Sequence, residues 1–535
     1  MAMKRESVEE FSAQLSAQIW GHRFKDGQKG PEYVLEFLNV LKGTNYNFSA
    51  KDYFRVRSTG LRQFIFEGDK EGAKAEIVSL TTEQKESLYK LVENKDELNV
   101  IRDFFRNLEI PLTDGTGKTA NRSWYAKTLY PLHESLLFFE LRTHNNNSNK
   151  SYSYERNFFA RGGELYFLML SHGTENNLVL RNKIEERLQE LLGRNKAIEN
   201  IVSKISNCLE KGSQKKKVET YPLKKVEGNT KEYPYLPTTN NPLYIEFAEE
   251  FYRLISLNID IYELFELMTS LITFQLARYM LNRALINKDD SFYMFFDCLG
   301  AQVGPIQKLS AKSFSENELL IKNKFEHYFQ QIFTEKLNSE EFVNENLAQW
   351  HENPEELINI LGLSRLSKVR KNKIAKIIQK CNFYSDIMTK LFIVVKDIVS
   401  DQLKKHQLSI VRGLARDGGF GGYRKGSKYR YFMSDNFIQV LVYANLEPNK
   451  QMEFNIFLEK LYKKYGFIIG ELQAKGNGIY EKSKLNVSYF QKNEYALREK
   501  LRHNGLLIEY SDATAMISNP YEYSQAGQVV ENENV

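Results

Sequence analysis

The segment 243–281 places the strongest limit on the fold, because its apolar residues cover several faces of a helix. A helix that is apolar all round is buried, either in the core of a large protein or in a membrane. A membrane span needs about 18 consecutive apolar residues, and the closest approach in this chain is the short stretch LFIVV at 391–395. We therefore predict that 243–281 is the centre of a helical bundle in a protein that does not enter a membrane.

The length and the periodicity together predict a mainly α, multidomain fold. The 535 residues exceed the ~250–300 at which a single hydrophobic core stops growing. Helical spacing of apolar residues is lost mainly in 212–242, which holds four of the eleven prolines. The predicted units are a mostly helical N-terminal domain with a few short strands (1–211), a linker or long loop (212–242), a central helical domain (243–410), a basic arm rich in glycine and aromatic residues (411–433), a winged-helix domain (434–520) and a disordered acidic tail (521–535).

Local signals predict both helices and strands in the N-terminal domain. Pro31 stands at a favourable first position for a helix, and a capping pattern predicts a second helix over 81–100. Residues 53–57 and 62–66 are predicted to be short strands, and residues 123–142 an aromatic-rich helix.

The C-terminal end has the order of a winged helix. Ser434 is a predicted N-cap for the first of three helices, which are expected over 435–446, 452–465 and 493–503. Residues 506–517 then alternate around a turn, which predicts a hairpin. The pattern over 497–521 resembles the recognition helix and wing of the winged-helix superfamily. That resemblance implies binding to DNA or to a partner protein, since the fold serves both.

Positive charge is concentrated in one part of the chain. Between positions 361 and 430, seventeen Lys and Arg face only four Asp, a net charge of +13, whereas the whole chain carries +6. Such an asymmetry predicts a local face that binds a polyanion. Two alternatives stay open, because the same residues can form a solvated surface or pair with acids elsewhere in the fold.

The densest combination of useful residue types lies at 412–431. Glycine lets a backbone approach a phosphate strand, Arg and Lys neutralise it, and aromatic rings stack on bases. A glycine-rich hinge between domains is the alternative interpretation. The predicted nucleic-acid-binding residues lie in this arm, in a basic helix before it and in the predicted recognition helix. They are Arg365, Lys368, Arg370, Lys371, Lys373, Arg412, Arg416, Arg424, Lys425, Lys428, Arg430, Arg498, Lys500 and Arg502.

Other motifs do not support catalysis. The sequence DGTGKT at 114–119 ends like a phosphate-binding loop, but Leu112 stands where the first glycine is needed. The histidines and the three cysteines have no metal-ligand spacing. The motif RGGE at 161–164 fits either a phosphate contact or a helix break with a structural ion pair, and we favour the ion pair. We therefore predict no catalytic residue, no metal and no cofactor.

Two stretches resemble large proteins that are encoded beside ATPases in bacterial phage-defence islands. One is IWGHRF at 19–24, and the other combines residues 122–131 with residues 158–166. The resemblance implies an accessory, DNA-engaging component of a multi-gene anti-phage system, and it implies no residue-level chemistry.

These observations lead to one function and two alternatives. We expect a non-catalytic, cytoplasmic subunit that binds double-stranded DNA within a larger bacterial assembly, because the N-terminus lacks an apolar signal segment and the basic residues cluster. The first alternative is a scaffold whose winged helix binds a protein partner such as an ATPase or nuclease. The second is a nuclease whose active site is assembled only in three dimensions.

Overall fold

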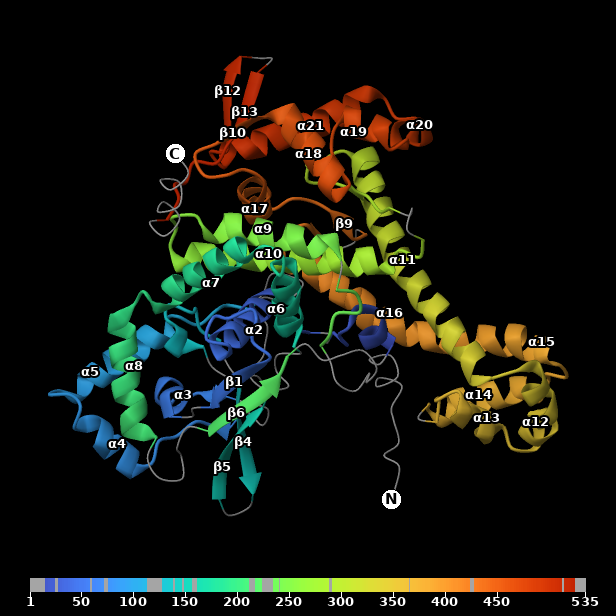
Figure 1. The fold of residues 1–535 in the computed structure, drawn as a ribbon, viewed down its shortest axis with the longest axis horizontal. Coiled ribbons are helices and arrows are strands. Elements are labelled where there is room, and N and C mark those ends of the chain that lie inside the picture. Colours follow the sequence, from blue (N-terminus) through green and yellow to red (C-terminus); the bar gives the residue numbers. More distant parts are fainter. Residues whose placement is uncertain are drawn as a thin grey trace.

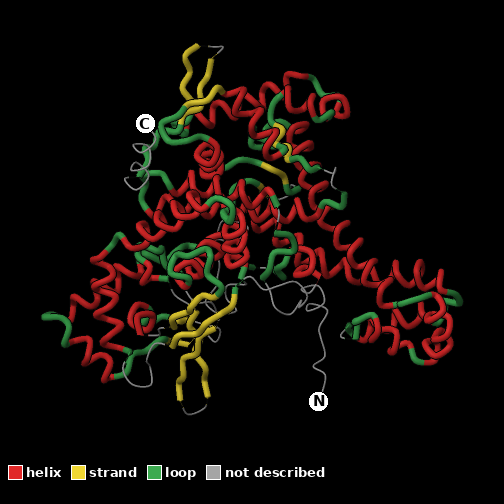
Figure 2. The backbone as a smooth tube through the Cα atoms, viewed as in Figure 1, coloured by secondary structure: helices red, strands yellow, loops and turns green. Residues whose placement is uncertain are grey.

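The structure is a computed structural model of the chain, and it describes residues 15–24, 27–57, 60–71, 76–112, 128–137, 140–146, 149–155, 161–210, 217–223, 234–239, 241–287, 291–364, 366–423, 428–511 and 514–524. It is mostly helical with small sheets, as predicted, and the strands lie mainly in short pairs at its edges (Figure 2). The motif at 114–119 and the tail beyond 524 lie outside the described residues.

Two helices cross the middle of the molecule and organise the rest (Figure 1). They are α9 (Pro242–Ile255) and α10 (Ile261–Ala284), and they confirm the central helical block, with a break before Asp260. The Asp260 carboxylate caps α10 by accepting the N–H groups of Tyr262 and Glu263 at 2.7 and 3.0 Å. α10 is buried on all sides because α2, α9, α11, α16 and α17 pack around it.

The N-terminal part packs against this centre through three helices, α2, α6 and α7, and carries a smaller core of its own. Its helices are α2 (Gly30–Gly43), α3 (Gly60–Ile65), α4 (Thr82–Tyr89), α5 (Lys95–Arg106), α6 (Gly162–Gly173), α7 (Leu178–Gly193) and α8 (Lys196–Leu209). Its strands form three antiparallel pairs: β1 (Asp52–Arg57) with β6 (Lys217–Pro222), β2 (Lys70–Glu71) with β3 (Glu76–Ile77), and β4 (Glu140–Asn146) with β5 (Asn149–Glu155).

Some predicted elements of this part are present and others are wrong. The strand at 53–57 is confirmed as β1, and its partner β6 comes from within the stretch predicted as a linker. Residues 62–65 belong to helix α3 and Phe66 to the turn after it, so the predicted strand at 62–66 is wrong. The side chains of Arg102 and Arg106 donate to the carbonyls of Phe64 and Ile65 at the end of that short helix (2.8 and 2.7 Å).

Two predicted helices also differ from the structure. The helix predicted over 81–100 is two helices, α4 and α5, which a turn separates before the N-cap Asn94. The helix predicted over 123–142 is wrong where it is described, since residues 140–146 form β4 with the backbone of 149–155 as partner. A hairpin partner of this kind outweighs local helical spacing.

Helix α2 and helix α6 approach each other closely because α6 begins with two glycines. A Cβ atom on Gly163 would lie 2.4 Å from the backbone nitrogen of Phe37 and 2.5 Å from the carbonyl oxygen of Tyr33. No side chain fits there without moving the backbone of α2.

A lobe of short helices projects at one end of the molecule (Figure 1, lower right). The 33-residue helix α11 (Gly304–Lys336) leads out to α12 (Glu340–Glu352), α13 (Pro354–Ile360), α14 (Lys368–Ile378) and α15 (Tyr384–Asp386). After a π-helical turn at Ile387–Leu391, helix α16 (Phe392–Asp417) returns alongside α11 to the centre. Trp350 is fully buried in this lobe.

The C-terminal part lies on the opposite side of α9 and α10 from the N-terminal part (Figure 1). Its elements are β8 (Gly421–Gly422), β9 (Arg430–Tyr431), α17 (Asp435–Asn445), β10 (Gln451–Glu453), α18 (Phe454–Tyr465), β11 (Phe467–Ile468), α19 (Glu471–Gly476), α20 (Ile479–Ser483), α21 (Val487–His503), β12 (Leu507–Ser511) and β13 (Thr514–Ser518). The three predicted helices, the Ser434 cap and the hairpin are confirmed. β10 joins the hairpin in an antiparallel sheet of order β10-β13-β12.

One hydrophobic core connects the C-terminal part to the centre. Phe274 of α10 contacts the rings of Phe437 and Phe467 at 5.1 and 5.7 Å between centroids. β11 also pairs, in parallel, with β7 (Met294–Phe295), which precedes α11. The same continuous core includes buried residues of α2, α10, α16 and α18, so it crosses both predicted interdomain segments.

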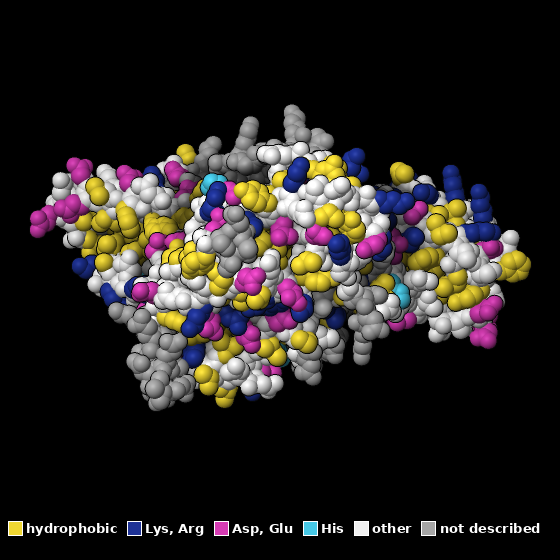
Figure 3. Space-filling model, turned by 90° about the horizontal axis from the view of Figure 1, so that it is seen from above, with side chains coloured by type: hydrophobic (Ala, Val, Ile, Leu, Met, Phe, Trp, Pro, Cys, Tyr) yellow, Lys and Arg dark blue, Asp and Glu magenta, His cyan; other side chains and the backbone are white. Residues whose placement is uncertain are grey.

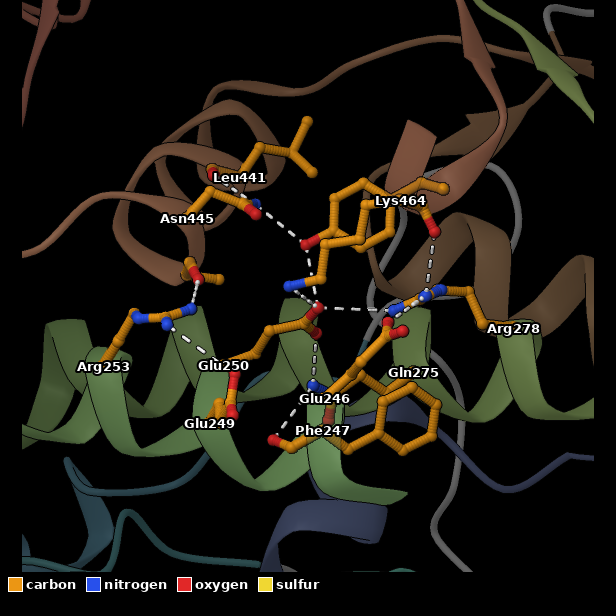
Figure 4. A network of polar contacts seen from close by, with 12 residues as sticks. Glu246, Phe247, Glu249, Glu250, Arg253, Gln275, Arg278, Leu441, Asn445 and Lys464 are labelled. Atoms are coloured by element: carbon orange, nitrogen blue, oxygen red, sulfur yellow. Dashed lines mark hydrogen bonds and ion pairs between the residues drawn. The ribbon is translucent and has the colours of Figure 1, made fainter. Parts of the chain in front are cut away.

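A buried ionic cluster fastens α18 to α9 and α10 (Figure 4). The Glu250 carboxylate is fully buried and accepts from Lys464 Nζ (2.6 Å), Gln275 Nε2 (2.7 Å) and the Tyr465 hydroxyl (2.9 Å), with Arg278 Nη1 at 3.4 Å. Burial alone would raise the pKa of Glu250, but the charges of Lys464 and Arg278 outweigh it and hold that pKa below its ordinary value. The carboxylate is therefore ionised at neutral pH.

Candidate nucleic-acid interface

The described residues of the predicted basic arm, 411–423 and 428–433, are folded rather than extended. Residues up to Asp417 complete α16, and the glycines after it are packed tightly against α10 and α17. Gly419 has a φ of +73°, and a Cβ atom there would lie 2.0 Å from the Ser434 hydroxyl. The Ser270 hydroxyl donates to the carbonyl of Gly418 at 2.6 Å. These glycines allow close packing, whereas the sequence suggested a flexible arm at this position.

Arg430 must also be corrected as a phosphate-binding residue. Its side chain is 5% exposed, and its Nε donates to Asp297 Oδ2 at 3.0 Å. Asp297 is itself fully buried and accepts the backbone N–H groups of Leu299 and Ala301. The guanidinium is thus an internal partner of a loop, and a phosphate has no access to it.

Other cations of the predicted arm do converge on a cavity of about 670 Å³. It lies between the first turn of α2, one face of α11, the last turns of α16 and the β8–β9 hairpin. We call it the basic pocket and define it by its polar and aromatic lining residues: Gln28, Lys29, Tyr33, Phe314, Glu318, Arg412, Arg416, Tyr423, Lys428 and Tyr429.

Aromatic rings form one wall of the basic pocket. The ring of Tyr429 lies between those of Phe314 and Tyr423, with centroids 5.3 and 5.0 Å away. The guanidinium carbon of Arg412 is 5.1 Å from the Tyr429 centroid, within cation–π range. Tyr423 ends the row and is 46% exposed.

Two acidic residues position the arginines of the pocket. Glu318 binds Arg412 through both carboxylate oxygens, with Nη2 to Oε2 at 3.0 Å. Asp417 accepts from Arg416 Nε at 2.8 Å and from the backbone N–H of Gly30 at 2.9 Å. The second contact ties the end of α16 to the start of α2, so the two sides of the pocket are held together.

A second hollow of about 780 Å³ continues the basic pocket along α11. The two share Ala311, Ser315, Glu318 and Lys428. The second hollow adds three lysines and one acid of α11, Glu316, which lies 3.7 Å from Lys312. The whole feature, here called the basic groove, comprises the basic pocket with Lys308, Lys312, Glu316 and Lys322.

Lys29 and the α11 lysines did not figure in the sequence prediction. Lys308, Lys312 and Lys322 are spaced by four and ten residues, which places them on one face of a helix, and this spacing is a signal that was readable. Lys29 carries no such signal, since only the packing of α2 against α16 brings it to the groove.

The basic residues of α14 lie apart from the groove, in the projecting lobe. Lys368 and Lys373 are exposed, Arg370 and Lys371 are half-buried, and Lys371 Nζ is 3.0 Å from Glu355. A group of Lys and Arg side chains is visible at that end of the surface (Figure 3, right). Arg365, Arg424 and Lys425 fall outside the described residues.

The cations of α21, the helix that the sequence predicts as a recognition helix, are largely engaged within the protein. Lys500 Nζ donates to the carbonyl of Met433 at 2.9 Å, and Arg498 lies over the ring of Phe454 at 5.4 Å. Arg502 is half exposed and pairs with Glu499. α21 also borders a cleft of about 1010 Å³ against residues 298–303, lined in part by Leu299, Val303, Tyr495 and Ala496.

The RGGE motif has a structural role, as favoured. Arg161 Nε donates to Glu164 Oε2 at 2.7 Å, and the Tyr53 hydroxyl donates to the same oxygen at 3.0 Å. Beside them, Glu36 lies 3.5 Å from Arg55, and both side chains are buried. Buried ion pairs that hold α2, β1 and α6 together account for the motif.

Glu36 in this cluster predicts a pH-dependent stability. Burial raises the pKa of Glu36 to about 7, against 4.5 when exposed, and the neighbouring Glu164 also raises it, whereas Arg55 lowers it. Between pH 4.5 and 7 the folded protein therefore binds more protons than the unfolded chain, and its stability falls as the pH rises, by about 3 kcal/mol in total.

Replacing Glu36 by Gln removes this proton and its linkage. We expect the free energy of unfolding of Glu36→Gln, relative to wild type, to improve by about 3 kcal/mol between pH 5 and pH 8. Urea unfolding of both proteins at the two pH values measures it. Parallel pH profiles for the two proteins would contradict the assignment.

Comparisons place no constraint on function: no protein-family model, no curated protein and no solved structure matches this chain. Across the described part of the chain, no helix is long and apolar enough to cross a membrane, and no group of three or more His, Cys, Asp or Glu could hold a metal ion. Function is therefore inferred from the geometry.

Proposed function

We propose that the protein binds nucleic acid, in the form of double-stranded DNA, along the basic groove. The observation that carries this proposal is convergence: cations from three separate segments, at Lys29, on α11 and at the end of α16 with the following hairpin, line one continuous hollow. Several cations along one groove suit a phosphate backbone, which supplies most of the affinity in non-specific binding.

The C-terminal elements support a winged helix as part of the same proposal. The order α17, β10, α18, α21, β12, β13 and the sheet order β10-β13-β12 agree with the helix and strand order of that fold, with β11, α19 and α20 inserted. In this arrangement α21 is the helix that enters a DNA groove, with the half-exposed Arg502 near its end. The protein would then be a non-catalytic, cytoplasmic subunit of a multi-protein assembly, as the likeness to phage-defence components implies.

A second candidate function is a scaffold, and the surface of α21 favours it. Two of its three predicted cations are engaged within the protein, and the cleft beside it combines apolar side chains with charged ones of both signs. A protein partner, such as an ATPase or nuclease subunit, suits such a surface better than a phosphate backbone does. The scaffold alone predicts no measurable affinity of the isolated protein for DNA.

The groove proposal predicts a specific loss of affinity. Lys308, Lys312 and Lys428 are exposed groove residues, and replacing all three by Gln removes three phosphate contacts. We expect duplex binding at 0.15 M salt to weaken on the order of 100-fold, measured by fluorescence anisotropy with a random-sequence duplex.

The matched control replaces Lys90, Lys196 and Lys204 by Gln. These lysines are exposed on or beside α4 and α8, in the N-terminal part away from the groove, and their removal changes the net charge equally. We expect the control to bind within about twofold of wild type, because screening limits distant charges. An equal loss in both triple variants would mean that total charge, and not the groove, determines binding.

A further inference from the structure

We propose that the basic pocket holds a single nucleoside phosphate, supplied either as a free nucleotide or as the phosphorylated 5′ end of a DNA strand. The inference deepens the proposed function and rests on it for the strand end. It concerns only the enclosed end of the groove, where α2, α11, α16 and the β8–β9 hairpin meet.

The size and enclosure of the pocket suit a small ligand rather than a duplex. Its volume of about 670 Å³ lies within the range of roughly 300–1,000 Å³ that is usual for small-molecule and cofactor sites. Elements from three distant parts of the chain form its walls, and the Asp417–Gly30 contact of 2.9 Å holds two of them in register. The packing of these distant segments against one another therefore forms the pocket.

The aromatic wall supplies a surface on which a base can stack. Phe314 and Tyr429 are packed into the wall, whereas Tyr423 at the end of the row is 46% exposed. Arg412 is held beside the Tyr429 ring by its paired contact with Glu318, so a cation borders the aromatic wall. A flat ring set beside cations is the arrangement that binds unpaired nucleotides.

The charge of the pocket suits a phosphate. Lys29, Arg412, Arg416 and Lys428 line it, and Glu318 is the single acidic lining residue among the described ones, with Asp417 behind Arg416. Without these cations, the Glu318 carboxylate would repel a bound phosphate.

The test uses the full chain and three defined probes. The first is free AMP, the second is a ten-nucleotide single strand with either a 5′-phosphate or a 5′-hydroxyl, and the third is a dumbbell duplex whose ends are closed by loops. Tyr423→Ala removes the exposed stacking ring, Tyr423→Phe restores it, and Tyr89→Ala removes a ring of similar exposure (39%) from α4 as the control.

We expect wild type to bind AMP or the 5′-phosphorylated strand at least fivefold more tightly than the 5′-hydroxyl strand. Tyr423→Ala should lose at least fivefold of that affinity, since stacking accounts for this much, while Tyr423→Phe and Tyr89→Ala should keep it. If AMP binds but does not displace the 5′-phosphorylated strand, the ligand of the pocket is a free nucleotide. Preference for the strand end over AMP identifies DNA as its source.

Two results would overturn the inference. Binding of the dumbbell duplex distinguishes these results from a failure of the groove proposal. If the dumbbell binds but AMP and the phosphorylated strand show no preference, the pocket inference is wrong and the groove proposal stands. If Tyr423→Ala binds AMP and the phosphorylated strand as wild type does, the pocket is also not their site. If the dumbbell does not bind while AMP does, the groove proposal fails and the pocket holds a free nucleotide.

Discussion

Replacing Glu250 by Gln is expected to lower the free energy of unfolding by about 3–5 kcal/mol, because it leaves two buried cations without their shared anion. Lys464 and Arg278 both contact the Glu250 carboxylate, and all three side chains are buried or nearly so. The substitution keeps the shape of the side chain, so the loss reports charge rather than packing (Figure 4). The urea midpoint of the full-length protein measures it.

The neighbouring residue gives a matched control. Glu249 lies on the same helix, its side chain is 46% exposed, and its carboxylate is 3.7 Å from Arg253. Exposed pairs of this kind contribute little, so Glu249→Gln should change stability by less than about 1 kcal/mol. Equal midpoints for the two variants would show that the buried cluster does not hold α18 to the centre.

Replacing Gly163 by Ala is expected to destabilise the protein by about 1–3 kcal/mol or more, the usual cost of forcing extra atoms into a packed core. The added methyl would lie within 2.5 Å of two backbone atoms of α2, and a backbone cannot give way as a side-chain end can. Thermal unfolding of the full-length chain measures the effect.

Gly193 provides the comparison, because a Cβ atom there would meet nothing within 4 Å at the end of α7. Gly193→Ala should leave stability unchanged or raise it slightly, since alanine restricts the unfolded chain. A Gly163→Ala protein as stable as Gly193→Ala would contradict the close approach of α2 and α6.

Sequence patterns predicted helices well where capping and period act locally. Ser434 caps α17 and Thr81 caps α4 as their sequences indicate, because an N-cap bond joins residues three apart. Helix α3 could not be predicted in the same way. Its short apolar run fits a strand equally well, and its end is satisfied by Arg102 and Arg106, which lie about forty residues further along the chain.

Only part of the candidate site could be predicted from the sequence. The charge count located Arg412, Arg416 and Lys428, which the structure does bring together. It could not show that Arg430 serves a buried acid 133 residues away, nor that glycine at 418 and 419 permits packing rather than flexibility. Both outcomes depend on contacts between distant segments, which composition does not encode.

The salt dependence of duplex binding tests the central proposal most directly. For wild type, the logarithm of the association constant should fall against the logarithm of salt concentration with a slope of about −3 or steeper. The Lys308, Lys312 and Lys428 triple variant should flatten that slope by two to three units at ~0.9 per phosphate contact, while the Lys90, Lys196 and Lys204 control keeps it. Identical slopes for the three proteins, or no duplex binding by wild type even at low salt, would contradict DNA binding along the basic groove.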